Sequence, residues 1–254
     1  MSPTHLSPPV ALTIAGSDPS AGAGIQADLK TFTANGVFGL TALTCSTAQV
    51  PGCVSGVHAL PPAHLREQLR LLLDAYPVGA FKTGMLFSAA LIEVVMATIE
   101  ADAPDIPLVV DPVMIATSGD PLLEPDAIGL YKTGLLPMAT LFTPNLDEAS
   151  ALLDGAQITR DGLETAAAEL CSRYRTSVLL KGGHLETDDA TDVLATASQE
   201  PVVLSEPFVR GVSTHGTGCT YAAAIAAELA KGETLLSAVH AAKTYVTAAI
   251  TNSL

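Results

Sequence analysis

The residues best suited to chemistry lie near the end of the chain, in the run Ser213-Thr214-His215-Gly216-Thr217-Gly218-Cys219-Thr220. An alanine-rich run follows as far as Ala230 and predicts a helix that begins in this glycine-rich turn. The first N–H groups of a helix lack partners within it, and the helix dipole adds positive charge, so the turn could bind an anion. Cys219 lies at its mouth, where the pKa of a thiol can be lowered. An ordinary helix start with a buried cysteine would show the same pattern.

A second glycine-rich loop follows the first predicted strand. The apolar run 10–15 predicts a buried strand, the loop 16–24 contains three glycines, and a helix is expected over 25–34. A strand, a glycine-rich loop and a helix in this order are typical of ligand-binding turns in doubly wound sheets. The loop lacks the third glycine of a dinucleotide fingerprint and the Gly-Lys-Ser/Thr of a P-loop, so neither of those sites is predicted.

The rest of the chain alternates between predicted strands and helices. This alternation predicts an α/β fold with a mainly parallel central sheet, helices on both faces and a few antiparallel edge strands. One domain over 10–254 is expected after a loose segment at 1–9. Further strands are expected at 41–49, 54–59, 80–84, 107–110, 139–142, 177–180, 191–195 and 202–209, and further helices at 64–76, 88–99, 162–174, 217–230 and 235–250.

Polar side chains recur where these predicted strands end, although only 15% of the residues are charged. In parallel sheets, ligands bind at the carboxyl ends of the strands, so we expect these side chains to share one site. They are Asp28, Gln49, Lys82, Asp111, Asn145, Glu148 and Lys181.

The overall charge restricts the classes of partner. The 254 residues include 12 Lys and Arg against 26 Asp and Glu, a net charge of −14. Such a surface repels nucleic acid and anionic lipid, so neither is expected as a partner. The four cysteines form no Cys-x-x-Cys pair, which argues against a zinc site or a disulfide framework and fits a reducing cytoplasm. No apolar run approaches the length of a membrane span.

Taken together, these segments resemble the ribokinase-like small-molecule kinases, and most closely the hydroxymethylpyrimidine and phosphomethylpyrimidine kinases of thiamine biosynthesis. The resemblance covers residues 10–250, with the motifs in the same order. The motifs that carry it are Thr13–Ser20, Ala23–Lys30, Ala48-Gln49, Lys82–Leu86, Val110–Met114, Ser118–Leu123, Thr143–Asn145 with Glu148-Ala149, Leu180–His184 and Thr214–Thr220.

The resemblance implies an activity. The chain would use ATP and Mg²⁺ to phosphorylate a small-molecule substrate, 4-amino-5-hydroxymethyl-2-methylpyrimidine, and then its monophosphate, at one site. It also implies a cytoplasmic homodimer. Two alternatives stay open: a pyridoxine or pyridoxal kinase of the same fold, and a non-catalytic pyrimidine-binding protein.

The same resemblance implies roles for individual residues. Cys219 would be the base that accepts the hydroxymethyl proton, and Gln49 would recognise the aminopyrimidine edge with its amide. The remaining roles fall into four groups: an anion hole from the N–H groups of Gly216, Thr217 and Gly218; further substrate contacts from Gly16, Asp28, Met85 and Val113; ATP or phosphate contacts from Lys181, Asn145 and Thr214; and Mg²⁺ held through water by Asp111 and Glu148.

Several of these side chains also have a plainer interpretation. Gln49 could bond nearby backbone, Asp28 could be a first-turn acid, and Met85 could fill the core. Glu148 could be a capping acid, and Lys82 could only satisfy a strand end. His184 and His215 are expected to shape their loops rather than to catalyse.

One segment departs from the pattern of the family. Relatives usually continue Ala-Gln with Asn-Thr, whereas this chain has Val50-Pro51-Gly52-Cys53. Because this segment borders the substrate side, the choice between a pyrimidine and a pyridoxal acceptor stays open at the level of sequence.

Overall fold

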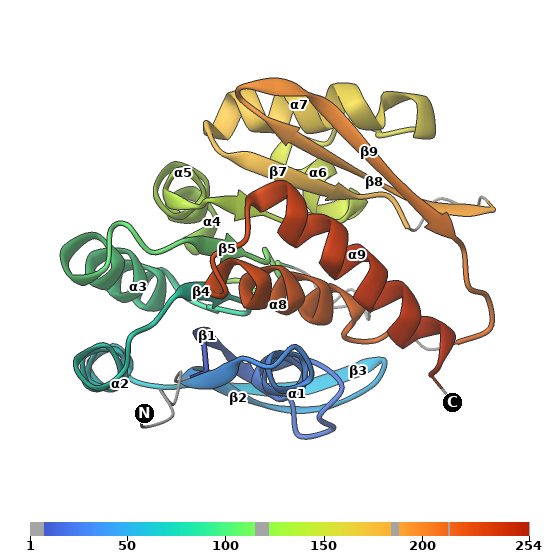
Figure 1. Ribbon diagram of the computed structural model, residues 1–254. Helices are drawn as coiled ribbons and strands as arrows, with labels where there is room; N and C mark the ends of the chain where they lie inside the picture. Colours follow the sequence, from blue (N-terminus) through green and yellow to red (C-terminus); the bar gives the residue numbers. More distant parts are fainter. Residues whose placement is uncertain (1–7, 115–121, 184–187, 213, 254) are drawn as a thin grey trace, which may run out of the picture.

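A single mixed sheet forms the centre of the molecule (Figure 1). The computed structural model describes residues 8–114, 122–183, 188–212 and 214–253. Within those ranges the strands follow the order β3-β2-β1-β4-β5-β6-β7-β8-β9. Their bounds are β1 Val10–Ser17, β2 Phe38–Val50, β3 Cys53–Ala59, β4 Ala80–Thr83, β5 Leu108–Val110, β6 Leu141–Phe142, β7 Ser177–Lys181, β8 Asp189–Thr196 and β9 Gln199–Pro207.

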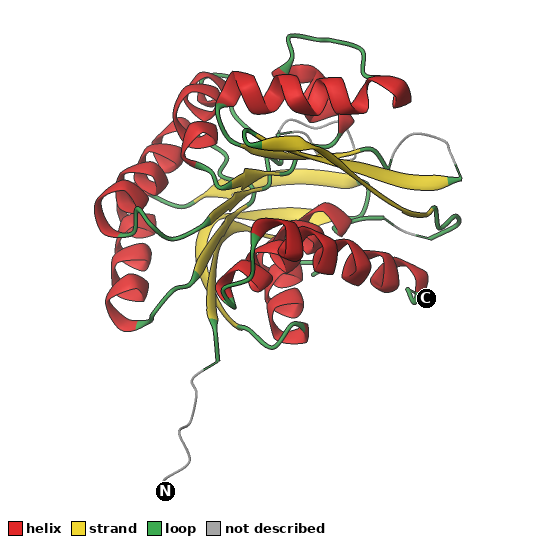
Figure 2. Ribbon diagram, turned by 45° about the horizontal axis from the view of Figure 1, so that its top comes forward, coloured by secondary structure: helices red, strands yellow, loops and turns green. Residues whose placement is uncertain are grey.

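Helices cover both faces of this sheet (Figure 2). Short 3-10 and π-helical turns, η2 and η1, occur beside the α-helices. The bounds are α1 Gly24–Ala34, α2 Pro62–Ala75, α3 Ala89–Asp102, α4 Ala127–Leu130, η1 Tyr131–Leu135, α5 Leu136–Met138, α6 Leu146–Leu152, η2 Arg160–Gly162, α7 Leu163–Tyr174, α8 Thr217–Ala230 and α9 Leu235–Thr251.

The predicted mixture of parallel and antiparallel pairing is confirmed. Strands β2, β1, β4, β5, β6 and β7 pair in parallel, whereas β3, β8 and β9 add antiparallel edges. Strand β2 begins at Phe38, earlier than expected, because Phe38 pairs with Val10 at the start of β1. The parallel strands therefore place their carboxyl ends along one edge of the sheet.

Side chains of the central strands point alternately to the two faces of the sheet and so contribute to two separate hydrophobic layers. Leu12 and Ile14 face the layer that holds α2, α3 and α7, whereas Ala11 faces the layer that holds α1, α8 and α9. Helix α8 contributes seven consecutive buried residues, 221–227, five of them alanines. Small side chains on the helix and on β1 let the two backbones approach closely, which places the first turn of α8 over the ends of β1 and β4.

None of the helices in the described ranges has the length and apolar composition that spanning a bilayer requires.

Candidate active site

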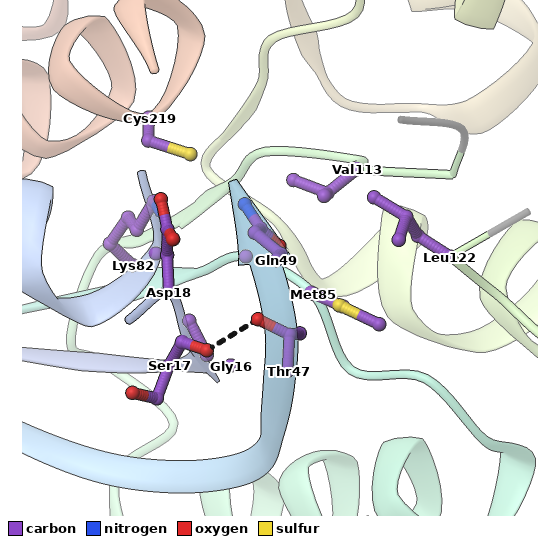
Figure 3. A pocket seen from close by; sticks show the side chains of 13 residues that line it. Gly16, Ser17, Asp18, Thr47, Gln49, Lys82, Met85, Val113, Leu122 and Cys219 are labelled. Carbon is purple, nitrogen blue, oxygen red and sulfur yellow. Dashed lines mark hydrogen bonds between the residues drawn. The ribbon is translucent and has the colours of Figure 1, made fainter. Parts of the chain in front are cut away.

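A pocket opens at the carboxyl ends of the parallel strands (Figure 3). Cys219 enters it from α8, Gln49 comes from β2, and Val113 and Leu122 lie on the opposite side from Cys219. Five of the predicted site residues therefore line one pocket: Gly16, Gln49, Met85, Val113 and Cys219. The full lining is Ala15, Gly16, Ser17, Asp18, Gly24, Thr47, Gln49, Lys82, Gly84, Met85, Val113, Leu122 and Cys219.

The two glycine-rich loops pack directly against each other. Gly216 has a φ of +79°, and a Cβ there would overlap the carbonyl oxygen of Gly22. His215 Nε2 lies 3.2 Å from Asp18 Oδ2, which also accepts the Ala23 N–H at 2.9 Å. The expectation that His215 shapes its loop agrees with this contact. The turn before α8 is thus fixed by the loop between β1 and α1, and only glycine fits position 216.

One of the three amides predicted to form an anion hole, that of Thr217, already has a partner, whereas the roles of the Gly216 and Gly218 amides stay predictions. The Thr217 N–H donates to Thr214 O at 3.2 Å, and its hydroxyl donates to the same carbonyl at 2.8 Å. Gly218 and Cys219 come next, at positions whose N–H groups have no carbonyl partner within the helix. The amides of Gly218 and Cys219 are therefore available to an anion, whereas the Thr217 amide bonds Thr214.

Lys181, at the end of β7, brings positive charge to this turn. A Cβ on Gly218 would lie 3.3 Å from Lys181 Nζ, so the ammonium lies against the turn and the missing side chain leaves room there. Lys181 Nζ also lies 3.2 Å from Asp111 Oδ1. Burial alone would lower the pKa of Lys181, but the carboxylates of Asp111 and Glu148 raise it above its ordinary value. Lys181 is therefore a permanent cation beside the anion hole.

Cys219 differs from the sequence-based expectation of a lowered thiol pKa. Burial raises the pKa of Cys219 to about 12; the Lys82 ammonium opposes this rise, and the carboxylates of Asp111 and Asp28 add to it. A hydrogen bond from the Gly24 N–H also favours the thiolate, but does not offset the burial. The surrounding protein therefore outweighs the helix N-terminus, so the side chain is a neutral thiol at neutral pH.

A buried ion pair lies beneath Cys219. Lys82 Nζ is 2.9 Å from both carboxylate oxygens of Asp28, and the Thr13 hydroxyl donates to Asp28 Oδ2 at 2.6 Å. All three side chains are fully buried. Asp28 is not among the residues that line the pocket, so its predicted substrate contact has no support there, and it instead pairs with Lys82. Lys82 does line the pocket, and it is the only cationic residue in the described lining.

The walls of the pocket suit a flat heteroaromatic ring. Met85 packs with Cys45 and Leu122 in a small apolar cluster, to which Val113 also belongs. A Cβ on Gly16 would lie 2.7 Å from Cys45 Sγ, so glycine is required where the ring side of the pocket meets β1. Strand β2 has a register shift between Ala48 and Gln49, and such a bulge re-aims the side chain that follows it. Gln49 thereby lines the pocket with its amide.

The acids predicted to hold Mg²⁺ lie on the Lys181 side of the site. Glu148 and Asn145 form a reciprocal capping box at the start of α6, so the capping interpretation of Glu148 holds for one of its oxygens. The other oxygen accepts the Met114 N–H at 3.3 Å. Burial raises the pKa of Glu148, with Lys181 acting in the opposite direction. An isolated parallel bridge joins Asn145 to Lys181, which holds these groups together.

This donor set fits Mg²⁺ only through water. Among the described residues, no group of three or more His, Cys, Asp and Glu side chains is arranged to hold a metal ion. The two carboxylates predicted to hold the metal ion, Asp111 and Glu148, are buried, and both already accept hydrogen bonds. Mg²⁺ usually keeps several waters and binds one or two carboxylates together with substrate phosphates, which matches this arrangement.

Sequence reasoning missed two contributors to the site. Asp18 accepts the N–H and hydroxyl of Ser20, both at 2.8 Å, as well as its contact with His215. Burial raises its pKa, but these hydrogen bonds outweigh burial and lower it below the ordinary value. An Asp two residues before a Ser in a glycine-rich loop is a signal for such a turn. The Asp28–Lys82 pair had no local signal, because its members are 54 residues apart. His184 and residues 118–121 of the predicted motifs lie outside the described residues.

The mainly parallel sheet, with a pocket lined by Lys82 and Cys219 at its strand ends, is the arrangement expected of a ribokinase-like small-molecule kinase. Comparison with known proteins agrees. The model of the phosphomethylpyrimidine kinase family matches residues 18–254. A hydroxymethylpyrimidine/phosphomethylpyrimidine kinase of Streptomyces coelicolor is 46% identical over 246 residues, which cover 97% of this chain and 90% of the relative. The chain belongs to the phosphomethylpyrimidine kinase family, and it is a kinase.

Solved structures include both kinds of vitamin kinase. An ADP complex of Bacillus subtilis pyridoxal kinase has a TM-score of 0.88 and 40% identity, covering 98% of this chain and 93% of that one. A phosphomethylpyrimidine kinase from Clostridium difficile has a TM-score of 0.81 and 36% identity, covering 95% of this chain and 99% of that one. The shared fold thus occurs in kinases that are named for two different acceptors.

Proposed function

We propose that the protein transfers a phosphoryl group from ATP to 4-amino-5-hydroxymethyl-2-methylpyrimidine, and then a second one to the resulting monophosphate, in thiamine biosynthesis. The observation that carries the proposal is the single pocket in which Gln49, Met85 and Cys219 meet, beside the anion hole and Lys181. The S. coelicolor relative bears the name of both activities.

Each wall of the pocket has a task in this reaction. The Gln49 amide supplies both a donor and an acceptor, which suits the edge of an aminopyrimidine, and Met85 packs on the ring. The hydroxymethyl group then points to Cys219 and the first turn of α8. Gly218 and Cys219 amides and Lys181 stabilise the negative charge on the transferred phosphoryl group. Bound Mg²⁺ would neutralise charge on the nucleotide phosphates, held through water by Asp111 and Glu148.

Cys219 contributes differently to the two steps. An alcohol must lose its proton as the phosphoryl group arrives. Cys219 would accept that proton as a thiolate, after its own proton has left for solvent, and the Lys82 ammonium favours this form. Because phosphoryl transfer passes through a loose transition state, the alcohol becomes acidic only late in the step. A phosphate acceptor is already anionic at neutral pH and needs no base.

This difference gives the test. We expect Cys219→Ala to lower the rate of the first step by about 10²–10⁴-fold, the usual contribution of a positioned base, and to affect the second step much less. Monophosphate and diphosphate are separated by chromatography in single-acceptor assays, and pyrimidine binding is measured in parallel. Full first-step activity in the variant would refute the base assignment.

Pyridoxal phosphorylation is the second candidate, favoured by the B. subtilis pyridoxal kinase structure. An ADP-release assay with hydroxymethylpyrimidine, its phosphate and pyridoxal separates the two, and a strong preference for pyridoxal would overturn the first proposal. A non-catalytic pyrimidine-binding protein would release no ADP with any of the three. The homodimer and the cytoplasmic location stay predictions from the sequence.

A further inference from the structure

Val113 has a backbone conformation that its side chain disfavours. Its φ is +45°, and it is the only β-branched residue among the non-glycine residues with positive φ in the described ranges. Branching at Cβ makes this region costly, so the surrounding structure must hold it there. Val113 also lines the acceptor pocket, opposite Cys219 (Figure 3). The strained residue is therefore part of the wall that the acceptor meets.

The contacts on either side of Val113 show what holds it. Before it, the Asp111 N–H donates to Thr83 O at 3.0 Å, which anchors the end of β5, and Pro112 has a fixed φ. After it, the Met114 N–H donates to Glu148 Oε1 at 3.3 Å. The Met114 carbonyl also accepts the Leu122 N–H at 3.0 Å, so Met114 is held through both its N–H and its carbonyl.

Glu148, which anchors Met114, also lies near Lys181, the residue predicted to contact phosphate. Its second oxygen accepts the Asn145 N–H at 2.9 Å, which fixes the carboxylate at the start of α6. The Lys181 ammonium attracts the same carboxylate. Glu148 is buried, with 4% of its surface exposed, so its position is set by these neighbours rather than by solvent.

We propose that Glu148, through the Met114 N–H, holds Val113 in its left-handed conformation against the acceptor, so that one carboxylate positions groups on both sides of the transfer site. Val113 is a positioning and specificity-determining residue, and Glu148 acts on acceptor binding as well as on the phosphates. The inference rests on the proposed function for the identity of the acceptor.

Two substitutions at Val113 separate the effect of its side-chain contact with the acceptor from the effect of its backbone conformation. Val113→Ala removes methyl groups that face the acceptor but keeps a Cβ, for which a positive φ is sterically unfavourable. Val113→Gly removes the strain as well. We expect Val113→Gly to raise the melting temperature by about 2–4 °C relative to Val113→Ala and to weaken acceptor binding about tenfold further, because the released segment leaves the wall.

The role of Glu148 is tested by acceptor binding without nucleotide or metal. By calorimetry, Glu148→Ala should weaken binding of hydroxymethylpyrimidine about as much as the strain-releasing step does. The double variant with Val113→Gly should bind no more weakly than the weaker of the two single variants, because both changes release the same segment. Unchanged acceptor affinity in Glu148→Ala, or additive losses in the double variant, would overturn the proposal.

Arg175→Gly is a matched control. Arg175 has a φ of +55° at the exposed end of α7 and does not line the pocket. It should gain stability while keeping its acceptor affinity. Equal affinity and equal stability of the glycine and alanine variants at position 113 would also refute the inference. Failure of the proposed function would appear instead in the unmodified protein, as binding and turnover of pyridoxal in place of the pyrimidine, and the same series can then be measured with pyridoxal.

Discussion

The ion pair beneath the pocket gives the sharpest prediction on stability. Lys82→Met removes the ammonium and keeps most of the side-chain volume, which leaves the Asp28 carboxylate buried with the Thr13 hydroxyl as its remaining bonded neighbour. Both members of the pair are fully buried, so water cannot replace the lost partner. Breaking such a pair from one side typically costs about 3–5 kcal/mol.

The cost should depend on pH in a definite direction. Burial already raises the pKa of Asp28, and the Lys82 ammonium opposes that rise. Without Lys82 the folded-state pKa rises further above the value in the unfolded chain. A carboxyl whose folded-state pKa is raised loses stability as pH rises from the unfolded pKa to the folded one. The variant should therefore be closest to the unmodified protein near pH 4 and fall behind it as the pH increases.

Denaturation in urea at several pH values measures this effect. The double variant Asp28→Asn with Lys82→Met replaces both charges, and it should recover most of the lost stability because no unpaired charge remains. Lys243→Met is a matched control, because Lys243 pairs with Asp192 at 2.7 Å in a second buried pair outside the pocket lining. The Lys243→Met variant should lose a similar amount of unfolding free energy to Lys82→Met. A stability loss in Lys82→Met below 1 kcal/mol, or one that does not grow with pH, would refute the reasoning.

Two further predictions concern the turn before α8. Gly216→Ala should abolish phosphoryl transfer and lower the melting temperature, since its Cβ would overlap the Gly22 carbonyl; activity assays and thermal denaturation check this, and an active variant would contradict the packing. Cys219 should react with iodoacetamide at pH 8 more slowly than an ordinary thiol, with a rate that rises about tenfold per pH unit, because its pKa is about 12. Mass spectrometry follows the modification, and rapid labelling at pH 7 would show an ionised thiol.

Features with a local sequence signal were predictable. The glycine-rich turns, the buried strands and the alanine-rich helix α8 follow from patterns within about ten residues, and the structure has each of them. The capping box of Asn145 and Glu148 likewise follows from their separation of three residues. Because parallel strands end along one edge, placing Gln49 and Cys219 in one site needed only the order of the elements.

Features that depend on contacts between distant segments were not predictable in this way. Asp28 looked like a first-turn acid or a substrate contact, and its pairing with Lys82 required the position of β4 beside β1. The raised pKa of Cys219 depends on how closely protein surrounds the sulfur, which no local pattern reports. The left-handed Val113 likewise arises from the anchor that α6 provides.

The contact between Asp18 and His215 joins residues 197 positions apart. During synthesis, the faces of β1 and β4 that α8 covers stay open until residues 217–230 have emerged, so the site cannot form on a chain that still lacks them. Contacts of such long range close late and slow the search for the native state. We therefore expect binding competence to appear at the end of folding, together with the burial of the alanine face of α8. A chain stopped before α8 would expose this apolar layer and be prone to aggregate.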